Sequence, residues 1–396
     1  MPEIAPRQPL TVRPDGELAF LDGLRGLAAF YVVVGHARWL LWEGYREGFL
    51  RHPESYTLTH TLLVYFFSLF KYGYEAVLFF FVLSGFVIHL RYARKLVANR
   101  TEANFDWAAF VRRRGKRLYP PLLAAMALSF ALDSVGVASG YSIYSQSTLY
   151  PVINENVLSH LDWLTFVGNL AYLMDTYVPV FGSDGPLWSL KFEWWFYMIY
   201  PLFWRVSKRS ITAASGVMAV LFLGSFRPGL WPAALLRDVF SAMLVWWLGV
   251  LLADVWAGRI RWRWSLVAVC SFGVSAPPLF LLGGAWRQLG IGFGFAGLLA
   301  FCFELQRRSV PLVWLERLKP LGDMSYTLYV IHFPVLVLLS GWLMSRSPGG
   351  LLPRHFGWVI GGIVATVALA YGLHFIIERP FLSRATRKPA AMGHTG

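Results

Sequence analysis

Cysteine is almost missing from this sequence. Of the 396 residues only Cys270 and Cys302 are cysteines, and both lie in apolar stretches. Two such residues exclude a disulfide framework and argue against a cysteine-based metal site. Charge is scarce as well, because Asp, Glu, Lys and Arg make up only 15% of the chain. Soluble domains normally have about a quarter of their residues charged, so the composition excludes that class.

The chain has long apolar runs instead. Hydrophobic residues make up 56% of it, and the mean hydropathy is +0.50. Runs of the roughly 20 residues that a transmembrane helix needs can be placed near 19–41, 74–90, 118–138, 186–206, 211–226, 234–254, 264–283, 286–305, 321–344 and 356–377. The sequence therefore predicts an all-α polytopic membrane protein with about ten transmembrane helices. A shorter run at 61–70 is predicted to be an interfacial or re-entrant piece.

The distribution of Lys and Arg predicts the orientation. Basic residues are disfavoured in translocated loops, and the 139–185 connection contains none. With that connection outside, most Lys and Arg fall on the cytoplasmic side, and both termini are predicted to be cytoplasmic. The net charge of +14 then reflects this bias and an attraction to anionic membrane lipid, not binding to nucleic acid.

The ends of the chain predict a simple domain organisation. Residues 1–18 have no apolar core, so we expect a cytoplasmic segment without a cleavable signal peptide. One transmembrane domain is predicted over 19–378, and the Pro/Arg-rich residues 379–396 are predicted to be a disordered cytoplasmic tail. We expect a multi-pass protein of the inner (plasma) membrane. No internal repeat of the kind that marks many transporters is evident.

Arg25 and His36 in the first span are the most informative pair. Eleven residues at about 100° each make three turns plus about 20°, so the two side chains share a helix face about 16.5 Å apart. A charged residue at the bilayer centre costs about 2.5 kcal/mol or more and normally faces a protein interior or a watery cavity. The pair predicts a site inside the membrane. By helix rise, Arg25 lies near the cytoplasmic end, His36 in the outer half, and His332 in the inner half of its own span.

Further motifs accompany this pair along the chain. They are FFxLSGF (Phe80 to Phe86), two arginines before Tyr-Pro (Arg113, Arg117, Tyr119, Pro120), W-S-L-x-x-E (Trp188 to Glu193), S-Y-x-x-Y-x-x-H (Ser325 to His332) and E-x-P (Glu378, Pro380). In this order, with Arg25 and His36, they resemble the acyltransferase-3 family of integral membrane O-acyltransferases, over nearly the whole chain. Glu75 and Lys191 depart from the family pattern, and we expect them to influence the choice of acceptor.

The resemblance implies an enzyme that takes an acyl group, often acetyl, from cytoplasmic acyl-CoA. It implies transfer to a hydroxyl of a carbohydrate or glycolipid acceptor, such as an envelope glycan, at the outer half of the membrane. No metal is implied. The esterase-like domain appended to some members is not in this sequence, so we expect transfer to be completed within the membrane domain.

The residue chemistry predicts roles that fit this activity. Arg113, Arg114 and Arg117, with Arg25, offer planar donors suited to the phosphates of CoA. His36 is predicted to be the general base, because an imidazole is poised for proton transfer near neutral pH. An acyl-histidine intermediate remains an alternative to direct attack. Tyr326, Ser325 or a buried arginine is the candidate for stabilising the oxyanion.

Other candidates have structural alternatives. His332 is predicted to be either a site residue or a structural histidine. Glu193 either orients a histidine or the acceptor, or simply neutralises Lys191. Asp22 is a helix N-terminal charge, a partner of Arg25, or both. Trp188 is placed with the substrate-binding candidates, and Ser84, Gly85 and Glu378 are predicted to serve packing and helix ends.

Two other function classes compete with the enzyme. A transporter or flippase of a lipid-linked sugar would also have buried charges, although the missing repeats disfavour it. A membrane scaffold or sensor would leave the Arg25 and His36 pair unexplained. The 139–185 connection, aromatic and anionic, is the expected surface for acceptor recognition.

Overall fold

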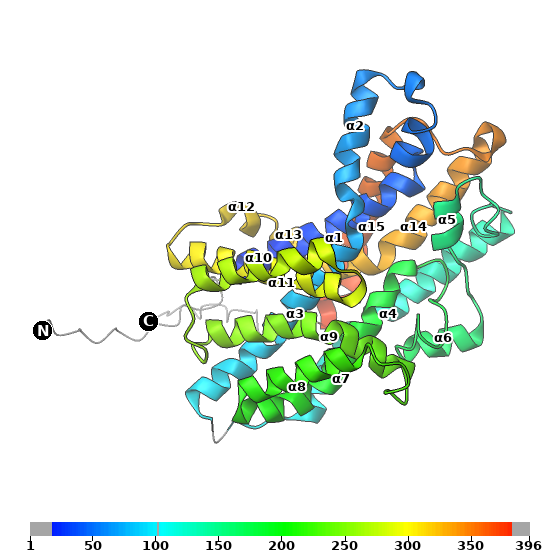
Figure 1. The fold of residues 1–396 in the computed structure, drawn as a ribbon. Helices are drawn as coiled ribbons and strands as arrows, with labels where there is room; N and C mark the ends of the chain where they lie inside the picture. Colours follow the sequence, from blue (N-terminus) through cyan, green and yellow to red (C-terminus); the bar gives the residue numbers. More distant parts are fainter. Residues whose placement is uncertain (1–17, 101–102, 382–396) are drawn as a thin grey trace, which may run out of the picture.

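The structure is a computed structural model that describes residues 18–100 and 103–381. Over these residues the chain is helical, and the strand-type pairing recorded is one isolated bridge between Met174 and Val178. The helices, shown in Figure 1, are α1 (Ala19–Leu40), α2 (Leu58–Ser68), α3 (Gly73–Ala98), α4 (Trp107–Ala138), α5 (Pro151–Asn156), α6 (Trp163–Leu170), α7 (Trp188–Arg209), α8 (Ile211–Gly224), α9 (Ala234–Trp256), α10 (Trp264–Leu281), α11 (Gly284–Arg307), α12 (Val313–Glu316), α13 (Lys319–Asp323), α14 (Ser325–Arg346) and α15 (Gly357–Ile377). The predicted all-α fold is confirmed.

Seven segments of the described chain are long and apolar enough to cross a membrane: Leu58–Ala98, Trp107–Ala138, Ala234–Trp256, Trp264–Leu281, Gly284–Arg307, Ser325–Arg346 and Gly357–Phe381. The protein is therefore a multi-pass membrane protein. Helices α1 and α7 have 22 residues each but fall outside this set. They contain the charged site candidates Arg25 and Glu193, which lower their hydropathy. Each of the predicted spans coincides with a helix, of which α8 is the shortest at 14 residues.

The short apolar run at 61–70 belongs to a separate helix, α2. A one-turn 3₁₀ helix, η4 (Leu69–Lys71), joins it to α3, and Phe70 there has the non-helical angles φ −90° and ψ 25°. Helix α2 lies at the top of Figure 1, and its Phe67 packs against Trp42 just after α1, with ring centroids 5.8 Å apart. Its outer face is apolar, since Leu58 and Leu62 are 76% and 61% exposed. Such a face suits contact with lipid.

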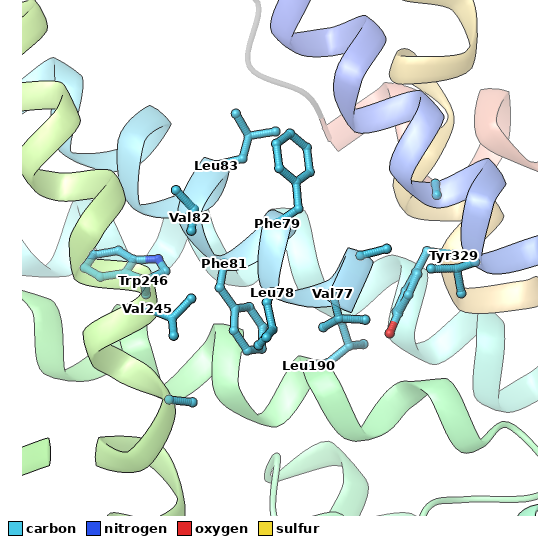
Figure 2. Packing of buried hydrophobic residues seen from close by; sticks show 14 of the residues in the cluster. Val77, Leu78, Phe79, Phe81, Val82, Leu83, Leu190, Val245, Trp246 and Tyr329 are labelled. Carbon is cyan, nitrogen blue, oxygen red and sulfur yellow. The ribbon is translucent and has the colours of Figure 1, made fainter. Parts of the chain in front are cut away.

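Close helix packing explains one glycine of the FFxLSGF motif. A Cβ atom added to Gly85 of α3 would lie 2.0 Å from the backbone oxygen of Trp246 in α9. Only glycine permits the two helices to approach this closely. Figure 2 shows side chains of α3, from Val77 to Leu83, gathered with Leu190, Val245 and Trp246 of the neighbouring helices. The predicted packing role of Gly85 is thus visible in the fold.

The two ends of the chain limit what the structure says about the predicted domain bounds. Residues 1–17 of the predicted N-terminal segment and 382–396 of the predicted tail lie outside the described residues. The first residues assigned to that tail, Arg379–Phe381, form the one-turn helix η7 against the end of α15.

Candidate active site

Helices α1 and α14 lie side by side and bring four predicted residues together in two contacts. Near the start of α1, Arg25 donates from Nε to Ser325 Oγ at 2.9 Å and from a terminal nitrogen to the Gly322 backbone oxygen at 2.7 Å. Near the other end, His36 Nδ1 lies 2.8 Å from His332 Nε2. The co-facial spacing on α1 is therefore matched by a second polar face on α14.

The predicted relative depth of the two histidines is wrong. Rise along each span separated His36 and His332, whereas their rings stack with centroids 5.0 Å apart. The reason is the start of α14. It begins with Ser325 level with Arg25, because the short helices α12 and α13 already pack against the first turns of α1. His332, seven positions after Ser325, contacts His36.

The hydrogen bonds of His332 fix the tautomers of both rings. His332 Nδ1 lies 2.7 Å from the backbone oxygen of Tyr329, and a carbonyl oxygen can only accept, so Nδ1 carries the hydrogen. In a neutral ring Nε2 is then the acceptor, and His36 Nδ1 must donate to it. This leaves Nε2 of His36 with a free lone pair. His36 Nε2 is therefore the one ring nitrogen of the pair that neither bond occupies.

One cavity collects most of the other candidates. We call it the arginine cavity. It lies among α1, α3, α4, α7 and α14. Its polar lining residues are Arg25, Ser84, Arg114, Arg117, Ser189, Glu193, Tyr197, Ser325, Tyr326 and Tyr329. Six residues predicted from sequence therefore face one space: Arg25, Arg114, Arg117, Glu193, Ser325 and Tyr326.

Several polar groups on this lining lack partners. The Nε atoms of Arg114 and Arg117 and the hydroxyl of Tyr326 are buried with no hydrogen bond in the described part of the chain. The Arg114 guanidinium lies over the ring of Tyr197, 5.3 Å from its centroid. Leaving a buried polar group unsatisfied costs about 1–3 kcal/mol, more for charged groups. The lining is thus suited to a ligand that supplies oxygen acceptors, as phosphates and thioester carbonyls do.

Glu193 is held by tyrosine, not by lysine. Its carboxylate accepts from the hydroxyl of Tyr197 one turn later on α7. That hydroxyl lies 3.2 Å from Ser84 Oγ, which also accepts from the indole of Trp246 at 3.2 Å. The alternative that Glu193 neutralises Lys191 is wrong. Ser84 of the FFxLSGF motif therefore belongs to a polar network as well as to a packed helix.

Lys191 has a different set of partners. Its Nζ lies 3.7 Å from the carboxylates of Asp175 and Asp238 and 2.8 Å from the hydroxyl of Thr176. The lysine side chain is 1% exposed and lines neither of the cavities described in this section. The Lys191 side chain points from α7 toward the loop that precedes α7 and toward the start of α9. Its contacts therefore hold these elements together.

We expect Lys191→Met to lower thermal stability without changing acceptor preference. The substitution keeps the packed stem but removes a charge whose partners, Asp175 and Asp238, are 61% and 25% exposed. Since water can solvate those carboxylates, the loss should be about 1–3 kcal/mol. Thermal unfolding in detergent measures it. A change in the ratio of acceptors used, at unchanged stability, would return Lys191 to the recognition role expected from the sequence.

Besides His332, three more predicted residues line neither the arginine cavity nor the second cavity described below. Arg113 is exposed, with its guanidinium 3.5 Å from the hydroxyl of Tyr92. Trp188 stacks on Tyr74 with ring centroids 5.3 Å apart. Asp22 lies 3.3 Å from Arg25 and 3.8 Å from Lys319. The partner role of Asp22 is confirmed, but neither cavity receives these three side chains.

A second space is lined by His36. We call it the histidine cavity. Its lining residues are His36, Arg38, Trp39, Trp42, Glu43, Gly44, Tyr45, Arg46, Glu47, Tyr65, Ser68, Lys71, Tyr150, Val152, Ile153, Asn156 and Leu352. The two cavities share no lining residue.

Four of these residues come from the 139–185 connection, which was expected to recognise the acceptor. Among them is Tyr150, whose oxygen accepts from the Leu352 backbone N–H at 2.7 Å. Burial raises the pKa of the Tyr150 phenol, so it stays neutral. The sequence reasoning missed Arg38 and the 43–47 segment. A basic residue two positions after His36 was the available signal.

Tyr329 was also missed as a site residue. Its hydroxyl lies 2.8 Å from Ser189 Oγ and donates to the Pro186 oxygen at 3.0 Å. Its side chain lines the arginine cavity, while its backbone oxygen binds His332. Tyr329 is therefore the residue at which the cavity and the histidine pair adjoin. Its place in the S-Y-x-x-Y-x-x-H motif could have indicated this.

The acyltransferase-3 family, described as an acyltransferase domain, matches residues 18–375. The chain belongs to this family. A Bacillus subtilis (strain 168) protein that bears the name of a peptidoglycan O-acetyltransferase, YrhL, is 26% identical over 349 residues, covering 80% of this chain and 51% of YrhL. O-acetyltransferase OatA of Staphylococcus aureus (strain NCTC 8325 / PS 47) is 24% identical over 397 residues, covering 91% of this chain and 56% of OatA.

Acyltransferase MdmB of Streptomyces mycarofaciens is 25% identical over 413 residues, and the match covers 94% of both chains. This acyltransferase thus spans about half the length of YrhL and OatA, but nearly all of MdmB. No solved structure matches it. Over the described residues, the acyltransferase has no group of three or more His, Cys, Asp or Glu placed to hold a metal ion.

Proposed function

We propose that this family member is a membrane O-acyltransferase that uses acyl-CoA as donor and a hydroxyl of a carbohydrate or glycolipid as acceptor. The observation that carries the proposal is the contact between His36 and His332 together with two cavities. His36 lines one cavity, which has aromatic and polar walls, and three arginines line the other, two of them with an unpartnered Nε. The names of YrhL and OatA support an O-acetyl group and an envelope glycan.

The arginine cavity supports the donor. Arg25, Arg114 and Arg117 all line it, and guanidinium groups bind phosphate with paired hydrogen bonds. Tyr326 has a free buried hydroxyl, which suits an oxyanion on the thioester carbonyl. Ser325 is less suited, because it already donates to the Gly322 oxygen at 2.7 Å while accepting from Arg25.

The histidine cavity supports the acceptor. In the proposed step, His36 Nε2 takes the proton of the acceptor hydroxyl as its oxygen forms a bond to the acyl carbon. The carbon–sulfur bond breaks, and the proton passes to the CoA thiolate. His332 holds His36 in the required tautomer. The acyl end of the donor reaches this pair past Tyr329. An acyl-histidine intermediate uses the same nitrogen.

The proposal includes an orientation in the membrane. The absence of Lys and Arg from residues 139–185 supports an outer position for that connection. The histidine cavity, which that connection lines, then opens outward, and Arg25, Arg114 and Arg117 lie toward the cytoplasm, where acyl-CoA is made. Both termini are cytoplasmic in this arrangement, and the membrane is the inner (plasma) membrane.

We expect the purified protein in detergent to release CoA from acetyl-CoA only when an acceptor is present. Radiolabelled acetyl-CoA with native envelope extract as the acceptor source would show label in a glycan or glycolipid fraction, together with an equal amount of free thiol. Longer acyl-CoAs belong in the same series. If no thiol is released while reconstituted vesicles move a lipid-linked sugar unchanged, the protein is a transporter and the proposal is wrong.

A further inference from the structure

The histidine cavity contains more unpaired positive charge than negative charge. Its two carboxylates already have partners outside the lining. Glu43 accepts from the hydroxyl of Tyr56 at 2.7 Å and lies 3.5 Å from Arg354. Glu47 lies 2.7 Å from Arg51. Neither carboxylate is therefore available to neutralise a cation that faces the cavity.

The cations on the same lining have no such partners. Arg38, Arg46 and Lys71 all line the cavity, and none of them has an ion pair with a carboxylate in the described part of the chain. Lys71 lies over the ring of its neighbour Tyr72, 5.0 Å from the centroid. The cavity thus has a positive field that its own residues leave uncompensated, and such a field attracts anions.

Arg38 is the central cation of this set. Its Nε atom is buried and has no hydrogen-bond partner among the described residues. A charged donor in that position costs free energy unless a ligand accepts its hydrogens. Arg38 and His36 are two residues apart and leave α1 on different sides, yet the long arginine side chain lets both border the same cavity.

We propose that the acceptor of this enzyme has an anionic group, a carboxylate or a phosphate, that binds Arg38 while a neighbouring hydroxyl reaches His36. This inference rests on the proposed acyl transfer, because it assigns the acceptor to the histidine cavity. The planar guanidinium suits either anion through paired hydrogen bonds. The aromatic ring of Trp39, beside His36 with centroids 6.0 Å apart, covers the apolar face of the same ligand.

The test measures binding of small probes to the full-length protein in uncharged detergent. Saturation-transfer NMR gives the dissociation constants of methyl glucuronide, glucose 6-phosphate and the neutral methyl glucoside. We expect at least one anionic probe to bind the wild type about tenfold or more tightly than the glucoside, as a charge-assisted hydrogen bond implies. The anionic probe with the lower dissociation constant indicates whether the acceptor has a carboxylate or a phosphate.

Substitutions at Arg38 connect the preference to this residue. Arg38→Gln should bring the anionic probes to the affinity of the glucoside, and Arg38→Lys should retain most of the preference. Arg91→Gln is the matched control, because Arg91 is exposed on α3 and lines neither cavity. All variants are compared with the wild type by size-exclusion profile.

The outcomes test the anionic acceptor separately from acyl transfer. The proposal of an anionic acceptor would be overturned by equal affinities for all probes or by no measurable binding. It would also be overturned if the preference for anionic probes remains in Arg38→Gln. Acetate and inorganic phosphate, tested alone, must bind more weakly than the sugar anions, or the site is for a free anion. Acyl transfer is assayed separately. Transfer without a charge preference would retain the enzyme and reject the anionic acceptor. Charge-dependent binding without transfer would reject the enzyme, and with it the acceptor, and would leave an anionic ligand of the histidine cavity.

Discussion

Replacing His36 with alanine is expected to lower kcat for acyl transfer by about 100- to 10,000-fold, the range that general base catalysis contributes. The expectation follows from the free lone pair on Nε2, which the bonds of Nδ1 to His332 and of His332 to the Tyr329 oxygen leave available. Release of CoA and labelling of the acceptor are the measurements. KM for the donor should change little, because His36 does not line the arginine cavity.

Two further histidine variants show whether the effect is specific. His60→Gln is the control, since His60 lies on α2 beside Thr57 and lines neither cavity. His332→Phe keeps an aromatic ring but removes the acceptor for His36 Nδ1, so its loss of kcat should be smaller than that of His36→Ala. Equal activity in His36→Ala and the wild type would remove His36 from the chemistry.

A second large effect is expected for Arg117→Gln, which should raise KM for acyl-CoA by about 10- to 100-fold. The guanidinium of Arg117 lines the arginine cavity, and its Nε has no protein partner among the described residues. A hydrogen bond to a charged group contributes about 1.5–3 kcal/mol, which corresponds to that range. Initial rates at varied acetyl-CoA concentration measure the change.

The neighbouring Arg113 provides a control from the same helix. Arg113 is exposed and lines neither cavity, so Arg113→Gln should stay within about twofold of the wild type, as surface substitutions usually do. The sequence motif groups the two arginines together, but only Arg117 borders the cavity. If both variants raise KM equally, the donor is held by the positive charge of the whole segment, and the arginine cavity is not its binding site.

Much of the fold follows from single-residue chemistry. Apolar runs of sufficient length give the helices, because an α-helix satisfies its backbone hydrogen bonds within the segment itself. The co-facial Arg25 and His36 were predictable from helix geometry alone. The position of α2 was harder to predict. An apolar helix of 11 residues is too short to cross the membrane alone, and its sequence does not indicate how it is joined to its neighbours.

The contacts between helices were beyond the reach of the sequence. Where α14 starts relative to α1 depends on α12 and α13, which pack against the first turns of α1, and no periodicity records such an offset. The depth of His332 was therefore misjudged. Neutralisation of Lys191 was one alternative for Glu193 because the two lie two residues apart, yet residues so spaced point to different sides of a helix. The free Nε of Arg38 depends on the pairing of Glu43 and Glu47 by Arg354 and Arg51.

The two cavities share no lining residue: His36 lines one, and its partner His332 is bonded to the backbone of Tyr329, which lines the other. An enzyme built in this way can react a substrate from one compartment with a substrate from the other without opening an aqueous pore. Ions then find no conducting path through the protein during turnover, so a cell can maintain its proton and potassium gradients while the catalyst works. Under the proposed mechanism, electrical insulation of the membrane would be a property of the same ring pair that handles the proton.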